Sequence, residues 1–186
     1  MTCIAGFIDA NEKIYMGGDG RGTSDCTIRT MHKEDAKVFK KGNRMLIGYA
    51  GSYRMGQLLQ YMLKVPTQPK NMDDDEFVCT KFCNAVIECF DKNKFNENNS
   101  GKVSMGNAFL VGYKGKLYKV YSDYTILKSN KNYDACGSGE DFAMASFHSI
   151  EKAGYNIPGD ERVMFALEVA GEFNNSVGPP YSVKKL

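Results

Sequence analysis

The residue whose chemistry stands out first is Thr2, which directly follows Met1. Methionine aminopeptidases generally remove Met1 when the second residue is small, and threonine is small. Removal would leave a first residue with both a hydroxyl and a free α-amino group. That amine has a pKa of about 7.7–8.0, so near neutral pH it can take the proton of its own hydroxyl. Thr2 is therefore a candidate nucleophile with a built-in base, although many chains begin Met-Thr without such chemistry.

Two charged residues would support this nucleophile if the fold brings them to it. Asp19 lies in the glycine-rich segment Gly17–Asp25 (GGDGRGTSD), and Lys37 stands at the head of the segment AKVFKK. If both point inward, the Lys37 ammonium pairs with Asp19 and lowers the pKa of the threonine hydroxyl. The competing interpretations are an aspartate that shapes a turn and a lysine that is solvated at a strand start.

Two glycine-containing turns, each before a helix, complete the candidate set. In Ala50-Gly51-Ser52, the Gly51 N–H would be left without a helical partner and could donate to an oxyanion. Ser138 lies between Gly137 and Gly139. It would cap the helix that follows, or, if the strand order places it beside Thr2, bond the amine and relay a proton.

The hydrophobic pattern predicts the elements that must position these residues. Paired strands with short turns predict local hairpins, and apolar residues at helical spacing predict four helices. The hairpins cover residues 3–18, 37–50 (turned at Gly42-Asn43) and 105–122, single strands cover 133–136 and 179–185, and the helices cover 51–65, 71–92, 137–154 and 159–174. Residues 17–25 and 94–102 are predicted to be loops.

This order of elements favours one architecture. Hairpins imply antiparallel sheets, and helices that arrive in pairs imply two helical layers, each covering one sheet. We expect an α+β fold, a four-layer αββα sandwich of two antiparallel sheets packed face to face. The alternative is a two-layer α+β fold, which would leave one helix pair without a sheet face to cover.

Composition sets the broad class. The 186 residues are 42% hydrophobic and 25% charged, which is typical of a folded domain, and we expect one domain over residues 1–186. A net charge of +2 argues against nucleic acid as a partner. No stretch is apolar for the roughly 20 residues a membrane span needs, and the N-terminus lacks the pattern of a signal peptide. We therefore expect a cytoplasmic protein without a membrane partner.

Neither the cysteines nor the acidic run predicts a metal site. Without an export signal we expect free thiols in place of disulfides. No CxxC pair exists, and the two histidines are far from the cysteines in sequence, so no metal or other cofactor is expected. The acidic run at residues 73–76 is interpreted as the first turn of a helix, where the helix dipole favours acids. The six cysteines are Cys3, Cys26, Cys79, Cys83, Cys89 and Cys136.

Taken together, these motifs resemble the proteasome β-subunit family of N-terminal-nucleophile (threonine) hydrolases. That family includes the peptidase subunit of bacterial two-component ATP-dependent proteases. The resemblance covers nearly the whole chain and rests on five matches in order. They are Thr2 at the mature start, a D-S-R-A-T-like loop at residues 19–23, Lys37-Val38 at a strand head, Ala50-Gly51-Ser52, and Gly137-Ser138-Gly139.

The resemblance implies an αββα fold and a threonine-type endopeptidase, with a role for each matched residue. Thr2 would be the nucleophile, Asp19 and Lys37 the supporting ion pair, the Gly51 N–H the oxyanion donor, and Ser138 the assistant at the amine. Thr23, Tyr49 and Tyr53, with Gly51, would border the pocket for the substrate residue before the scissile bond. The implied partners are copies of the chain itself in a ring, an ATP-dependent unfoldase, and a peptide or unfolded protein substrate.

The chain also departs from this family. Where the family often has an aspartate three residues before a Ser-Gly-Gly, this chain has Phe173 ahead of Ser176, and Glu172 lies one place early. Cys3 beside Thr2 is unusual and adds a second possible nucleophile. Two other classes therefore stay open. One is a catalytically inactive scaffold or interaction protein with the same fold, and the other is a small-molecule amidase using the same residues.

Overall fold

The computed structural model describes residues 2–24, 27–32, 36–99 and 102–186. It is a mixed α/β structure whose larger sheets are both antiparallel. The first sheet has the strand order β12-β1-β2-β13, with bounds Tyr133–Cys136, Ile4–Ile8, Ile14–Gly18 and Ser182–Lys185. The second has the order β11-β10-β9-β6-β5, with bounds Ile126–Lys128, Lys116–Val120, Phe109–Tyr113, Met45–Tyr49 and Val38–Lys41.

The first sheet places the start of β1 beside the end of β12. The β1–β2 hairpin turns at Asp9, whose side chain accepts hydrogen bonds from the main-chain N–H groups of Asn11 and Lys13. On its other edge β1 pairs antiparallel with β12, and Ile4 lies opposite Cys136. The chain that leaves β12 therefore passes directly beside the residues that precede Ile4.

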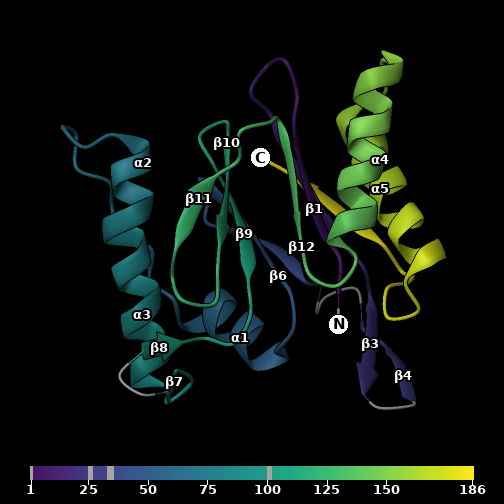
Figure 1. Cartoon of the computed structure of the whole chain (residues 1–186). Coiled ribbons are helices and arrows are strands. Elements are labelled where there is room, and N and C mark those ends of the chain that lie inside the picture. Colours follow the sequence, from purple (N-terminus) through teal and green to yellow (C-terminus); the bar gives the residue numbers. More distant parts are fainter. Residues whose placement is uncertain (1, 25–26, 33–35, 100–101) are drawn as a thin grey trace.

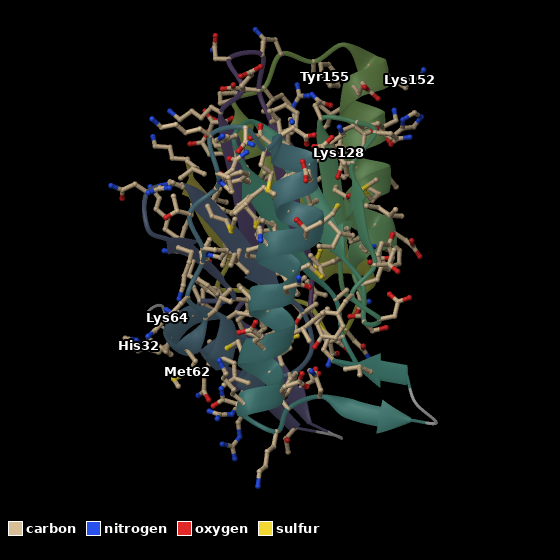
Figure 2. The ribbon with its side chains drawn as sticks, turned by 90° about the vertical axis from the view of Figure 1, so that its left-hand side faces the viewer. His32, Met62, Lys64, Lys128, Lys152 and Tyr155 are labelled. Carbon is tan, nitrogen blue, oxygen red and sulfur yellow. The ribbon has the colours of Figure 1, made fainter. Side chains whose placement is uncertain are left out.

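The helices fall into two groups. The first group consists of α1 (Tyr53–Gln57), continued by the π-helical turn η2 (Leu58–Met62), and the run of α2 (Asp74–Phe77), η3 (Val78–Phe82) and α3 (Cys83–Lys92). The second group consists of α4 (Glu140–Ala153) and α5 (Gly159–Phe173). In Figure 1 the α2–η3–α3 run stands on one side, α4 and α5 stand on the other, and both sheets lie between them. Figure 2, seen from the side of the first group, shows the same run crossing in front.

Three clusters of buried side chains match this arrangement. One joins the first helix group to the second sheet and includes Leu58, Phe82 and Val111. Another joins α4 and α5 to the first sheet, and it holds Cys3 and Ala5. The third lies between the sheets and holds Ile4 together with β-strand residues of both. Cys3 and Ala5 therefore face the α4 and α5 helices, while Ile4 faces the other sheet. Successive side chains of a strand point to opposite faces, and here both faces are covered.

Most predicted elements are confirmed, and three short stretches differ. All three predicted hairpins and the strands at 133–136 and 182–185 are present, and all four predicted helices have helical cores in these stretches. The segment predicted as a glycine-rich loop instead contains β3 (Arg21–Ser24), which pairs with β4 (Thr27–Thr30). The polar loop contains β7 (Glu97–Asn99) and β8 (Lys102–Ser104), and β11 was not predicted. The strands β3, β4, β7 and β8 are short and mostly polar, and β11 has only three residues, so their pairing has little hydrophobic signal.

The acids of residues 73–76 begin a helix, as predicted, and also form ion pairs. Asp73 caps α2 by accepting a hydrogen bond from the Glu76 N–H. Asp74 pairs with Lys114, and Asp75 pairs with Lys128. These lysine contacts hold the pKa values of both carboxyl groups at about 2. This acidic run therefore ties the start of the α2–η3–α3 run to the second sheet.

Within the described residues, no helix is long and apolar enough to cross a membrane. The same part of the chain contains no group of three or more His, Cys, Asp or Glu residues placed to hold a metal ion. Five cysteines are free thiols, of which Cys79 is exposed and Cys3, Cys83, Cys89 and Cys136 are buried. Cys26 lies outside the described residues.

Candidate active site

Thr2 lies buried two residues before β1, where the Gly137-Ser138-Gly139 turn holds its main chain. Only 2% of Thr2 is exposed. Its nitrogen donates to the Ser138 hydroxyl at 3.3 Å. Its carbonyl oxygen accepts from the Gly139 N–H at 3.3 Å and from the Ser138 hydroxyl at 3.4 Å. The pairing of β1 with β12 produces this contact, because it brings the end of β12 beside the start of β1.

Ser138 does not cap α4. The N-cap position of that helix is Gly139, and no side chain bonds the first-turn N–H groups from it. The Ser138 hydroxyl instead faces the main chain of Thr2. Of the two interpretations that the sequence left open, capping is wrong, and the position beside Thr2 is the one observed.

Gly137 allows the turn to approach Thr2 so closely. Its φ is +100°, a conformation that side chains disfavour, and a Cβ built there would lie 2.3 Å from the Thr2 carbonyl oxygen. Any other residue must therefore push Thr2 and the turn apart.

We expect Gly137→Ala to lower the free energy of unfolding by about 3 kcal/mol, because backbone strain and a steric clash add together. The matched control is Gly154→Ala, since Gly154 has φ +70° with nothing within 4 Å of the added Cβ. That control should cost only about 1 kcal/mol. Urea denaturation of the three proteins measures both values, and equal losses in the two variants would show that the contact with Thr2 does not matter.

Asp19 and Lys37 form an ion pair with almost no exposure, 0% and 1% of their side chains. The Lys37 ammonium donates to Asp19 Oδ1 at 2.8 Å and to the Arg21 carbonyl oxygen at 2.7 Å. Burial lowers the pKa of Lys37, and the neighbouring Asp19 carboxylate opposes that change. Two oxygen acceptors at hydrogen-bond distance favour the charged ammonium in this buried position.

Three main-chain N–H groups hold the Asp19 carboxylate in place. Cys3 N donates to Oδ1 at 3.0 Å, while Arg21 N at 3.1 Å and Gly178 N at 3.4 Å donate to Oδ2. The Asp19 N–H in turn donates to the Cys3 carbonyl oxygen at 3.3 Å. Because Cys3 is covalently joined to Thr2, the ion pair lies next to the candidate nucleophile.

Gly51 follows the end of β6, close to Thr2 and the ion pair. The Tyr49 N–H donates to the Lys37 carbonyl oxygen at 3.0 Å. The Ala50 methyl lies 3.1 Å from the Cβ position of Gly137, the point that would contact the Thr2 carbonyl. Gly51 itself has φ +91°, and the Asn107 side chain fills the space beside its Cα. The turn is therefore near Thr2, and the oxyanion role of the Gly51 N–H stays a prediction.

Two of the three predicted pocket residues line one cavity. Tyr49 and Tyr53 border a cavity of about 420 Å³. Its other described lining residues are Arg29, Thr30, Met31, His32, Gln57, Gln60 and Tyr61. Thr23 is not among them, but it follows Gly22, whose Cα packs against the Tyr53 hydroxyl. The cavity therefore combines aromatic rings with polar side chains. His32, one of the lining residues, is labelled in Figure 2.

The departure from the family at Phe173 is a surface feature here. Phe173 ends α5, is 68% exposed, and stacks on the Phe142 ring at 5.8 Å between centroids. Sequence reasoning missed the next residue, Asn174, whose side chain donates to the Ser138 carbonyl oxygen at 2.7 Å. An asparagine at a helix C-terminus is a common end signal, and this was the only clue to its contact with the turn. Ser176 is buried, and its hydroxyl donates to the Asn175 side chain.

Cys3 does not compete with Thr2 as a nucleophile. Burial raises the pKa of its thiol to about 12, and the Asp19 and Glu140 carboxylates add to that rise against the opposing effect of Lys37. The thiolate is the reactive form of cysteine. At neutral pH the Cys3 side chain is therefore protonated and inert, and its hydrophobic surroundings make it a core residue.

No protein-family model and no curated protein matches this chain, but many solved structures share its fold. Thiobacillus denitrificans BPH is 14% identical, over 100% of this chain and 97% of that one, with a TM-score of 0.81. HslV from Trypanosoma brucei is 14% identical, over 100% and 99%, with a TM-score of 0.68. Anbu (ancestral beta-subunit) from Yersinia bercovieri is 16% identical, over 100% and 81%, with a TM-score of 0.66. In fold, the chain is therefore similar to the proteasome β-subunit-like proteins that its motifs resemble.

Proposed function

We propose that this protein is a threonine-type endopeptidase of the N-terminal-nucleophile class, with Thr2 as its first residue once Met1 is removed. One observation carries the proposal. The buried Asp19–Lys37 pair lies against the start of β1, while the Ser138 hydroxyl contacts the Thr2 nitrogen from the turn after β12. A buried ion pair is expensive to maintain, and in this position it can act on the threonine hydroxyl.

In the proposed reaction the Thr2 amine takes the proton of the Thr2 hydroxyl as the oxygen attacks the peptide carbonyl. The carbon–nitrogen bond then breaks, the leaving amine takes that proton, and an ester remains on Thr2. Water attacks the ester with the amine again as base, which releases the acid product and restores the hydroxyl. No cofactor takes part. Where Met1 precedes Thr2, the nitrogen is an amide and has no basic lone pair, so that form is inactive.

Each remaining residue has a place in this proposal. The Lys37 ammonium, held by Asp19, favours the deprotonated form of the Thr2 hydroxyl. The Gly51 N–H donates to the oxygen of the tetrahedral intermediate. Ser138 bonds the amine and relays its proton. Tyr49 and Tyr53, with Thr23 nearby, receive the apolar side chain of the substrate residue before the scissile bond.

The proposal extends to architecture and assembly. The two helix groups and two sheets form a four-layer αββα sandwich, and residues 1–186 form a single domain. Copies of the chain assemble into a ring. Self-association is supported by the helical assembly of the Anbu complex from Pseudomonas aeruginosa, which shares this fold. A cytoplasmic peptidase of this kind acts on peptides or unfolded proteins, which an ATP-dependent unfoldase would supply.

The proposal is tested by the mass of the N-terminal peptide of the active protein together with a peptide hydrolysis assay. We expect hydrolysis from protein whose chain begins at Thr2, and none from protein that retains Met1. Equal activity in the two forms would exclude the amine as the base and overturn the proposal.

A further inference from the structure

Asn174 joins the end of α5 to the turn that contains Ser138. Its main chain caps α5, with the Asn174 N–H donating to the Ala170 carbonyl oxygen at 3.0 Å. Its side-chain nitrogen Nδ2 donates to the Ser138 carbonyl oxygen at 2.7 Å. Its side-chain oxygen Oδ1 accepts from the Ser176 N–H at 3.0 Å. One amide group therefore links the Ser138 turn to the loop after α5.

The two partners of this side chain have opposite hydrogen-bonding character. The Ser138 carbonyl can only accept, and the Ser176 N–H can only donate. The amide must therefore present its NH₂ group to Ser138 and its oxygen to Ser176, and this polarity defines its orientation. An ionised aspartate at position 174 could satisfy Ser176, but it would place an oxygen against the Ser138 carbonyl. The site therefore requires a donor and an acceptor on one short side chain.

Main-chain bonds hold the glycines of the turn, from the Gly139 N–H to the Thr2 carbonyl oxygen and from the Glu140 N–H to the Gly137 carbonyl oxygen. The Asn174 amide adds a side-chain bond to the residue between them, Ser138. Gly137 and Gly139 flank it, and the Ser138 hydroxyl meets the Thr2 nitrogen at 3.3 Å. A hydroxyl at that distance stays in place only if its backbone does. The Asn174 amide fixes the carbonyl of Ser138, the same residue whose hydroxyl contacts the Thr2 nitrogen.

We propose that Asn174 is a positioning residue that holds the Ser138 hydroxyl against the Thr2 amine, in place of the late acid that is absent at Phe173. This inference rests on the proposed threonine-peptidase function. Asn174 does not contact the reacting atoms, and it acts through Ser138. Its effect is therefore on the rate of the chemical step and not on the binding of the substrate.

The test compares Asn174→Asp and Asn174→Ala with the matched control Asn175→Asp in the full-length chain that begins at Thr2. The control adds the same charge one residue away and retains an acceptor for the Ser176 hydroxyl. We expect kcat for peptide hydrolysis to fall by about tenfold in both Asn174 variants, because a displaced Ser138 serves the amine poorly. KM should stay within about twofold, since the substrate pocket is elsewhere.

A second readout separates positioning from folding. The Asn174→Asp protein keeps the bond from the Ser176 N–H but loses the bond to the Ser138 carbonyl, so we expect its melting temperature to fall only a few degrees below that of the control. Its rate of covalent labelling by a peptide epoxyketone should fall with kcat. Wild-type labelling with unchanged kcat in both Asn174 variants would overturn the role of Asn174 and leave the proposed function intact. A loss that appears equally in Asn175→Asp would overturn it as a mere charge effect. A wild-type chain that begins at Thr2 but neither hydrolyses peptides nor is labelled would overturn both.

Discussion

A Thr2→Ala chain should lose peptide hydrolysis by at least about 1,000-fold, because it keeps the amine but has no hydroxyl to attack the carbonyl. Alanine is also small, so Met1 should still be removed from the variant, and the two proteins then differ only in the side chain. The contacts of Thr2 with Ser138 and Gly139 use main-chain atoms. We therefore expect these contacts to persist in the Thr2→Ala variant.

The matched control for this prediction is Thr2→Ser. Serine keeps a hydroxyl and an amine in the same relation, so measurable hydrolysis should remain while Thr2→Ala shows none above background. Steady-state kinetics with one fluorogenic peptide would give both values. Hydrolysis by Thr2→Ala at a rate near that of the wild type would place the nucleophile elsewhere in the chain.

Lys37→Met should have the largest effect on stability, with a loss of about 3–5 kcal/mol in the free energy of unfolding. Among the described residues, the substitution leaves the buried Asp19 carboxylate with main-chain N–H groups as its partners. Peptide hydrolysis should be lost as well, because no cation then favours the Thr2 oxyanion. Denaturant unfolding and the hydrolysis assay measure the two effects.

A double variant separates the two roles of this ion pair. Asp19→Asn with Lys37→Met removes both charges, so part of the lost stability should return while hydrolysis stays absent. Lys40→Met, in the strand that follows Lys37, is the surface control, since Lys40 is exposed, and it should change stability by no more than about 0.5 kcal/mol. Full hydrolysis in the folded double variant would remove Asp19 and Lys37 from the mechanism.

Much of the fold follows from local patterns in the sequence. The hairpins of residues 3–18 and 37–50 have short turns between apolar strands, and the structure confirms both. The order of strands across each sheet also depends on long-range pairing, such as β1 with β12 and β6 with β9. No local pattern encodes those partners. The β3–β4 hairpin was missed because Gly22 and Ser24 are typical of turns and β4 is exposed on every residue.

The candidate site was predictable by residue type but not by contact. Thr2, Asp19 and Lys37 were selected because of their chemistry, and the structure brings them together in one buried region. The sequence left two interpretations of Ser138 open. The structure decided between them, because it shows the contact between Ser138 and Thr2, which are 136 residues apart. Asn174 carried no chemical signal of its own, since its role depends on a carbonyl and an N–H that belong to two different loops.

The most direct test of the central claim is covalent labelling with a peptide epoxyketone, followed by mass spectrometry of the digested chain. One of the structures with this fold is BPH in complex with epoxomicin, which makes that probe class the natural choice. The account predicts one adduct per chain on the peptide that begins at Thr2, and no adduct on Thr2→Ala. An unlabelled N-terminus in protein that lacks Met1, or an adduct on another residue such as the exposed Cys79, would contradict it.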